Sequence, residues 1–222
     1  MGYIFRPGLH ACDVAGSLVF LDLPADRYFL LAPSLNTACL RLCSGHDTDP
    51  TNQLAIHRLV DRDIVRSIDG AIRPTLCAPL ACHTPTGRNR GIEATSSSVI
   101  TALAQYAFAA VDLKCRSLDR VLNGIARSRL CKKRVLGVRS ARDPAEVACA
   151  FMAADRLITL RGHCLVRSIA ITRTMVARGV APDLVLGVKL RPFEAHCWVQ
   201  HDNMLISDDP GTVAPFTPIL IV

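Results

Sequence analysis

The sequence has no run of about 18 apolar residues, the length that a helix needs to cross a bilayer. Its first residues, Met1 to Arg6, are too short and too mixed in character for a secretory signal peptide. Aromatic residues make up only 5% of the chain, and no phosphate-binding loop or other nucleotide motif is visible. We therefore expect a cytoplasmic protein with no membrane segment and no cofactor.

Cysteine, by contrast, is frequent, with ten in 222 residues. A disulfide framework would not persist in a reducing compartment, so most of these thiols are expected to be structural. Cys39 and Cys43, one helical turn apart beside leucines, have the pattern of small core residues. Cys77, Cys82 and His83 could begin a zinc site, but no second pair of ligands follows at a suitable spacing. The pattern therefore favours a protein without a metal.

Charge is unevenly distributed along the chain. Residues 1–85 carry seven arginines and no lysine against eight aspartates, whereas residues 86–142 carry twelve basic and three acidic residues. The basic run 132–134 could bind an acidic partner or a nucleic acid. Beyond Tyr106, however, this region offers only Phe108 for stacking on a base, which favours a solvated helix face.

The first 80 residues are expected to form a compact unit of small strands followed by three helices. Turn and cap residues predict strands at 9–13, 16–23 and 27–31, and helices at 34–42, 52–59 and 61–68. Ser34 would cap the first helix, Gly45 would stop it, and Gly70 would end the third. This order is typical of a winged helix-turn-helix-like domain over residues 1–80. Residues 81–98, rich in threonine, serine, glycine and proline, are predicted to be a linker.

Residues 99–222 show helices first and strands after them. The apolar patterns predict helices at 99–113, 118–125 and 164–178, a further helix opening at Asp143 and Pro144, and strands at 184–190 and 195–200. Gly179 would end the helix that starts at residue 164. Helices followed by an antiparallel sheet are typical of the α+β class.

Cys164 opens one of these helices, and this position suits a nucleophile. A cysteine attacks as the thiolate, which is favoured at a helix N-terminus and beside cations such as His163 and Arg161. On the later strand, His196 and Trp198 would share one face. Spacing alone leaves two interpretations open: a catalytic pair, or a core cysteine and a histidine on a wet strand face.

An aspartate that orients the histidine can be sought across the hairpin after His196. If residues 202–203 close the hairpin, Asp209 lies opposite His196. If residues 201–203 close it, Asp208 lies opposite instead. The asparagine that ends the longer loop tolerates the left-handed conformation which that loop requires, so we expect Asp208.

Several separated motifs occur in order: Cys-Leu-Val-Arg-Ser at 164–168, Ala-His-Cys-Trp-Val at 195–199, then Asp208 and Phe-Thr-Pro-Ile at 216–219. Together they resemble the lasso-peptide biosynthesis B proteins, which are transglutaminase-like cysteine peptidases. Members usually have alanine between the histidine and the tryptophan. This chain has Cys197 there, which places a second thiol beside the expected base.

The resemblance implies a papain/transglutaminase-like cysteine peptidase domain in residues 99–222, with Cys164 as nucleophile, His196 as base and Asp208 as orienting acid. It implies that residues 1–80 are a RiPP recognition element, which binds the precursor's leader peptide by strand addition. The leader would be cleaved from the core before an ATP-dependent lasso macrolactam synthetase closes the ring. The backbone N–H of Cys164 could hold the oxyanion, and the second donor stays unassigned.

Three alternative functions can be compared with leader cleavage. The same triad serves acyl transfer in transglutaminases and arylamine acetyltransferases, where an amine replaces water. A non-catalytic leader-binding scaffold would carry a structural Cys164. A DNA-binding winged helix is disfavoured, because residues 1–85 are net negative and phosphate contacts need basic residues.

Overall fold

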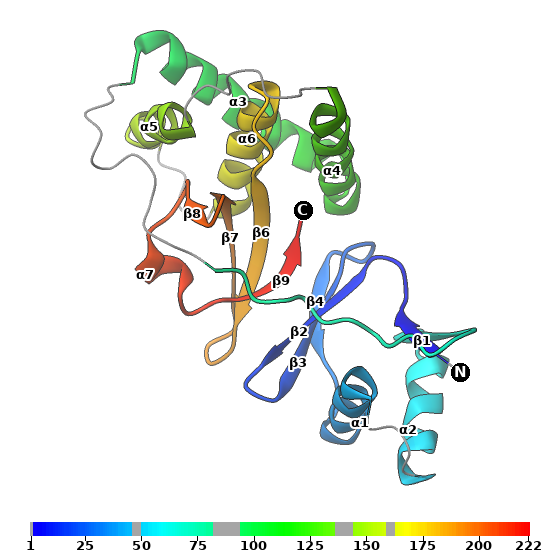
Figure 1. Cartoon of the computed structure of the whole chain (residues 1–222). Helices are drawn as coiled ribbons and strands as arrows, with labels where there is room; N and C mark the ends of the chain where they lie inside the picture. The colour runs from blue at the N-terminus through cyan, green and yellow to red at the C-terminus, as the bar shows by residue number, and fades with distance from the viewer. Residues whose placement is uncertain (1, 46–49, 82–93, 136–143, 159–162) are drawn as a thin grey trace.

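The computed structural model describes residues 2–45, 50–81, 94–135, 144–158 and 163–222 and has the expected α+β organisation (Figure 1). An N-terminal half of small strands and two helices lies beside a larger C-terminal half, in which helices cover an antiparallel sheet (Figure 1). No helix within the described ranges is both long and apolar enough to span a membrane.

The N-terminal half is a three-stranded meander packed on two helices. Its strands are β2 (Leu9–Val14), β3 (Ser17–Asp22) and β4 (Arg27–Leu30), and its helices are α1 (Pro33–Ser44) and α2 (Pro50–Asp61). These elements confirm the three predicted strands and the first two predicted helices. Ser34 is not the cap, because Pro33 already lies in the first turn and Ala32 is the N-cap. Gly45 ends α1 in the left-handed conformation, as predicted.

The helix predicted for residues 61–68 is wrong. Asp63 has a positive φ of 51°, and β5 (Val65–Ile68) then pairs antiparallel with β1 (Gly2–Phe5). Ile64 and Val65 are buried in the apolar core that the N-terminal sheet shares with α1 and α2. Because the strand partner lies at the start of the chain, a local pattern could not reveal it. A two-stranded ribbon therefore stands where a winged helix-turn-helix would have its third helix.

The C-terminal half contains the predicted helices and strands. Its elements are α3 (Ser96–Cys115), α4 (Leu118–Val135), α5 (Pro144–Asp155), α6 (Cys164–Ala177), β6 (Asp183–Lys189), β7 (Glu194–His201), β8 (Met204–Leu205), α7 (Pro210–Val213) and β9 (Thr217–Ile221). The sheet order is β8-β7-β6-β9. Thr95 caps α3, so the end of the predicted linker is helical, whereas residues 82–93 and the predicted cap Asp143 lie outside the described residues.

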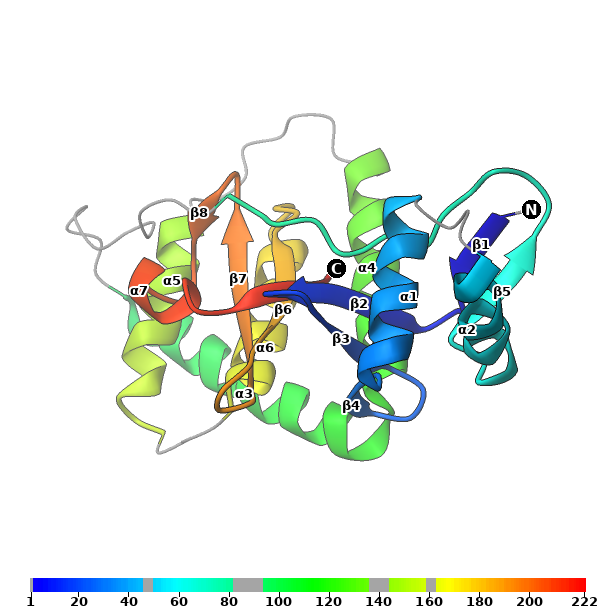
Figure 2. The same ribbon diagram turned by 90° about the horizontal axis from the view of Figure 1, so that it is seen from below.

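Helix α6 is the central helix of this half. It packs against β7 and is covered by α3 and α5, so that the long helices lie over one side of the sheet (Figures 1 and 2). Apolar side chains such as Ile169, Ile171 and Met175 are fully buried along it. The position of the first turn of α6 is therefore fixed relative to β7, which carries His196.

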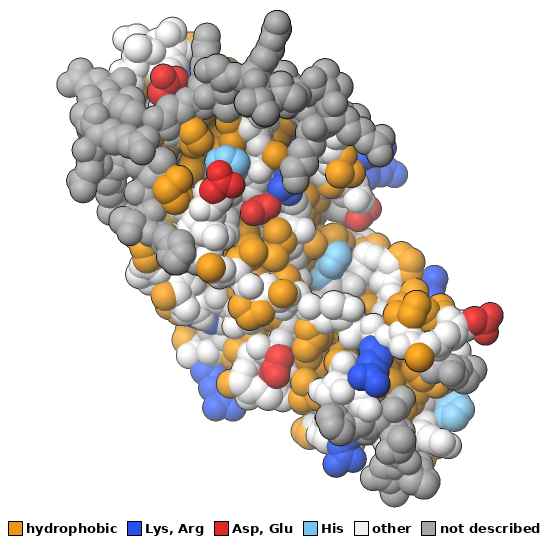
Figure 3. All heavy atoms as spheres, viewed as in Figure 1, with side chains coloured by type: hydrophobic (Ala, Val, Ile, Leu, Met, Phe, Trp, Pro, Cys, Tyr) orange, Lys and Arg blue, Asp and Glu red, His pale blue; other side chains and the backbone are white. Residues whose placement is uncertain are grey.

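One hydrophobic core extends through both halves. Val19 and Leu21, on one face of the N-terminal sheet, belong to the same buried cluster as residues of α4, α6 and β9. Leu18 and Phe20, on the other face, pack with residues of α1 and α2. Strand β2 lies beside β9 in both ribbon views (Figures 1 and 2), and hydrophobic side chains predominate over the middle of the face in Figure 3. The two halves are thus packed together rather than joined only by a linker.

Candidate active site

Cys164 is the first residue of α6, as predicted, and His163 is the N-cap. The thiol is half-buried, and hydrogen bonding to the His196 imidazole and to the backbone N–H groups of Cys197 and Leu165 lowers its pKa despite burial. N–H groups in the first turn of a helix have no intrahelical partner, and the helix dipole there favours negative charge. This environment stabilises a thiolate. The predicted contribution of Arg161 lies outside the described residues.

His196 lies on β7 directly opposite Gly187 of β6. Its ring is stacked with Trp198 at a centroid distance of 6.2 Å and packs against Phe216 at 5.2 Å. A Cβ atom at Gly187 would lie 2.5 Å from the indole ring, so only glycine leaves room for Trp198 on this face. The common orientation of His196 and Trp198 confirms the predicted alternation of the strand.

The hairpin after β7 closes with two residues. Asp202 and Asn203 both have positive φ, at 49° and 64°, and His201 pairs with Met204. The three-residue loop that we predicted is therefore wrong. Two left-handed residues match the twist of the flanking strands, and aspartate and asparagine both tolerate this conformation.

Asp208 nevertheless lies beside the histidine, with 3.2 Å between His196 Nε2 and Asp208 Oδ1. The backbone pairing of the hairpin reaches Ile206, whose N–H donates to the Val199 carbonyl at 2.9 Å. Beyond this point the Ser207 hydroxyl accepts the Val199 N–H at 2.9 Å, and it donates a hydrogen bond to Asp208. The chain has then left the strand, so a register extended from the loop does not apply to Asp208.

The three side chains shift one another's pKa in the directions that a thiolate–imidazolium pair requires. Burial opposes charge on Cys164, but hydrogen bonds from His196 and from backbone N–H groups outweigh it and lower the thiol pKa. Burial also opposes charge on His196, yet Asp208 and Cys164 raise its pKa to about 9. Burial would raise the pKa of Asp208, whereas His196, Ser207 and Arg167 bring it below its usual value. These shifts favour the charged form of all three groups, a thiolate, an imidazolium and a carboxylate.

Cys197 does not share this environment. Its side chain faces the core on the opposite side of β7 and is buried, and burial strongly raises the pKa of its thiol. Its carbonyl accepts a hydrogen bond from the Ser168 hydroxyl at 2.9 Å. The second thiol introduced beside the histidine is therefore a structural residue.

The possible zinc ligands are only partly described. Cys77 is half-buried and its N–H donates to the Ala11 carbonyl at 2.9 Å, while Cys82 and His83 lie outside the described residues. Within the described part of the chain, no group of three or more histidine, cysteine or acidic residues could hold a metal ion.

The polar residues that surround Asp208 were not predicted from the sequence. Ser207 hydrogen-bonds its carboxylate, and Arg167 Nη1 donates to the Ser207 carbonyl and lies 3.7 Å from Asp208 Oδ2. The available signal was the spacing of Arg167, three residues after Cys164, which places both side chains on neighbouring positions of one helix face.

Comparison with known proteins found two matches. A family model described as the transglutaminase-like superfamily matches residues 107–221. A segment of 51 residues is 36% identical to the Microcin J25-processing protein McjB of Escherichia coli, covering 23% of this chain and 24% of that protein. The match thus spans about a quarter of the curated relative's length. No solved structure matches the chain.

Proposed function

The chain belongs to the transglutaminase-like superfamily, and from this membership we propose that it is a cysteine peptidase that cleaves the leader from a lasso-peptide precursor. The observation that carries the proposal is that His196 hydrogen-bonds Asp208 at 3.2 Å and lowers the pKa of the Cys164 thiol, with all three residues within the matched region. The similarity to a protein named for processing microcin J25 supports the resemblance to lasso-peptide biosynthesis B proteins.

In the proposed mechanism the Cys164 thiolate attacks the carbonyl carbon of the peptide bond that joins leader to core. The protonated His196 gives its proton to the leaving amine, so the core departs with a free N-terminus and the leader remains as a thioester. The neutral imidazole then deprotonates a water molecule, which attacks the thioester and releases the leader as a carboxylic acid. Asp208 engages Nε2, which leaves Nδ1 for the thiol and fixes the orientation of the ring.

The oxyanion would be held by the backbone N–H of Cys164 at the start of α6. This donor has no intrahelical partner, because it belongs to the first turn. The N–H of Cys197, which already reaches the Cys164 sulfur, is the proposed second donor. Sequence reasoning could not name it, because it depends on how β7 packs against α6.

Leader binding is proposed to add a strand to β4. The Ala11 carbonyl of β2 accepts the N–H of Cys77, so a segment of the chain already occupies that edge of the sheet. Among the described residues, none forms a backbone hydrogen bond with the outer edge of β4. An exposed edge with unpaired N–H and C=O groups is the requirement for β-strand addition.

Strand β4 also contacts the C-terminal half. The Tyr28 ring contacts Phe193, in the connection between β6 and β7, at a centroid distance of 5.4 Å. Burial, with smaller contributions from Cys197, Asp26 and Cys164, raises the pKa of Tyr28 to about 12. Tyr28 therefore links β4 to the connection that leads into β7, the strand that carries His196.

The reaction would release a core peptide with a free amino group. The proposed partner is the ATP-dependent lasso macrolactam synthetase, which would join this amine to an acidic side chain of the core. Nucleic acid is not a proposed partner, because residues 1–85 are net negative.

Product analysis tests hydrolysis against acyl transfer. A precursor peptide with leader and core, to be sought as a short open reading frame beside the gene, is incubated with the protein, with and without an added primary amine. The masses of the products are then measured by mass spectrometry. Hydrolysis predicts a leader with a free carboxylate under both conditions. A leader carrying the amine as an amide would instead support the transferase alternative.

Thiol alkylation tests the enzyme against the scaffold. If the protein is a peptidase, Cys164 should be alkylated faster at neutral pH than the other cysteines. His196→Ala should remove this difference in rate, because the thiolate loses its imidazolium partner. A scaffold predicts that Cys164 reacts no faster than the exposed Cys115.

A further inference from the structure

We propose that Arg167 is a positioning residue that holds Asp208 within reach of His196. The proposal rests on the function proposed above and names a residue that acts on the triad without touching the substrate. Arg167 lies one turn after Cys164 on α6, so it links the helix that carries the nucleophile to the segment that carries the orienting carboxylate.

The segment that carries Asp208 needs such a contact. Strand β8 ends at Leu205, and the backbone pairing with β7 does not continue past Ile206. After that point, the contacts that hold the segment beside β7 and α6 come from side chains. The Ser207 hydroxyl bonds the Val199 N–H, and Arg167 bonds the Ser207 carbonyl.

Arg167 is itself held in place from a second direction. Its Nε donates to Asp155 Oδ2 of α5 at 2.9 Å, and the other oxygen of Asp155 accepts the hydroxyl of the buried Tyr106 of α3. The guanidinium thus bridges α5 and the segment after β8 with two separate N–H groups. A planar guanidinium can donate in two fixed directions at once, whereas an ammonium on a flexible stem cannot hold both partners in one geometry.

The charge of Arg167 supports the same role. Nη1 lies 3.7 Å from Asp208 Oδ2, while His196 occupies Oδ1 at 3.2 Å. A cation on this side of the carboxylate keeps it ionised and turned towards the imidazole. With Arg167 removed, the carboxylate could rotate away, and a misplacement of about 1 Å in a catalytic group can cost about a hundredfold in rate.

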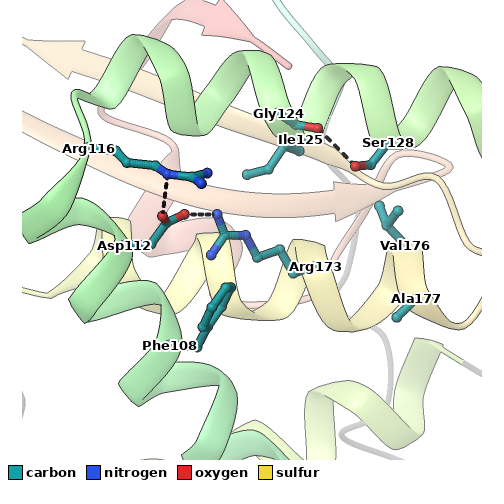
Figure 4. Close-up of a pocket in the computed structure, with 9 residues that line it drawn as sticks. All are labelled: Phe108, Asp112, Arg116, Gly124, Ile125, Ser128, Arg173, Val176 and Ala177. Carbon is teal, nitrogen blue, oxygen red and sulfur yellow. Dashed lines mark hydrogen bonds and ion pairs between the residues drawn. The ribbon is translucent and has the colours of Figure 1, made fainter.

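Arg173 offers a matched control on the same helix. It pairs with Asp112 of α3, as does Arg116 at 3.3 Å, and its guanidinium lies over the Phe108 ring at 5.0 Å (Figure 4). Its side chain is 20% exposed, against 21% for Arg167. It lines a cavity of about 380 Å³ between α3, α4 and α6, and none of the three proposed site residues lines that cavity. Replacing Arg173 therefore removes a comparable ion pair without touching Asp208.

The test is the pH dependence of iodoacetamide alkylation at Cys164, measured in the full chain. Trypsin releases residues 162–167, a peptide that contains this cysteine alone, and in Arg167→Gln the peptide extends to Arg173 without gaining another. We expect Arg167→Gln to slow alkylation of Cys164 at neutral pH and to move the low-pH fall of the alkylation rate to higher pH. We also expect it to lower kcat for cleavage about a hundredfold. Arg173→Gln should leave all three unchanged.

The outcomes separate this inference from the proposed function. The positioning role alone would be overturned if Cys164 of the wild type is alkylated fast and with a lowered pKa, and if the pH profile of alkylation in Arg167→Gln is the same. Equal changes in Arg167→Gln and Arg173→Gln would also overturn it, because they would reflect a general loss of stability. A wild-type Cys164 with ordinary reactivity would overturn both proposals. If Arg167→Gln does not fold, Arg167→Lys is used in its place. Lysine keeps the positive charge but cannot donate to Asp155 and to the Ser207 carbonyl in one fixed geometry.

Discussion

At the scale of single residues, two thiols close to one histidine have opposite environments. The Cys164 sulfur lies at a helix start and accepts hydrogen bonds, which lower its pKa, whereas burial raises the pKa of Cys197 on the other face of β7. The sequence could predict this difference, since strand alternation turns Cys197 away from His196. The spacing of Arg167 places it beside Cys164 on one helix face. Its contact with the segment that carries Asp208 could not be predicted, because that contact depends on where the chain leaves the strand after Ile206.

The proposed pair predicts a defined pH dependence for cleavage. His196 has a pKa of about 9 and must be protonated to partner the thiolate and to donate to the leaving amine, so kcat/KM should fall as pH rises through about 9. It should also fall at low pH, where the Cys164 thiol gains a proton. Asp208→Asn removes a group that raises the His196 pKa, so the alkaline limb should move to lower pH. An unmoved alkaline limb in Asp208→Asn would contradict the role given to this carboxylate.

The two adjacent aspartates should differ sharply. Asp208→Asn should lower kcat by about 10⁴, the cost of the same change in serine proteases, because an amide is the wrong partner for the imidazole. Asp209 precedes α7 as its N-cap, so Asp209→Asn should change kcat by less than about tenfold. Steady-state kinetics of both variants decide the matter, and similar losses in the two would remove Asp208 from the triad.

At the scale of elements, the parts that were predicted are those governed by local pattern. Helix α6 begins at Cys164 and ends before Gly179, where the apolar period and the glycine indicated. Two predictions failed because the local period of apolar residues does not decide them. The helix expected at 61–68 is instead the strand β5, which pairs with the distant β1. The three-residue loop expected after His196 is instead a two-residue turn at Asp202 and Asn203.

The sheet behind His196 offers a stability test based on two glycines. Gly187→Ala would bring a methyl group to about 2.5 Å from the Trp198 ring and should lower the free energy of unfolding by about 1–3 kcal/mol. Gly124→Ala in α4 meets no atom within 4 Å and should raise it by about 0.5–1 kcal/mol. Denaturant unfolding of the two variants measures both values. A neutral Gly187→Ala would show that the packing of Trp198 against Gly187 is not tight.

At the scale of the whole molecule, the shared core joins the half proposed to bind the leader to the half proposed to cleave it. The sheet that would bind the leader buries Val19 and Leu21 against the C-terminal half, and its Tyr28 contacts Phe193 in the connection between β6 and β7. A fragment of residues 1–80 would expose this apolar face to water. Leader binding should therefore be measured with the full chain.

The full-length Cys164→Ala variant should bind fluorescent leader peptide as the wild type does, because strand addition at β4 does not involve the thiol. Its affinity should change little with salt, whereas binding through several phosphate contacts weakens by about 10³ to 10⁵ between low and moderate salt. Fluorescence anisotropy of labelled leader and of duplex DNA across a salt series measures both. Tight, salt-sensitive DNA binding without leader binding would refute the proposed role of the N-terminal half.

The central claim is that Cys164 is the nucleophile of a leader peptidase. To test it, the precursor is incubated with wild type, Cys164→Ala or Cys197→Ala, and the masses of the products are measured by mass spectrometry. We expect free leader and core with wild type and with Cys197→Ala, and intact precursor with Cys164→Ala. Cleavage by Cys164→Ala at the wild-type rate, or loss of cleavage only in Cys197→Ala, would contradict it.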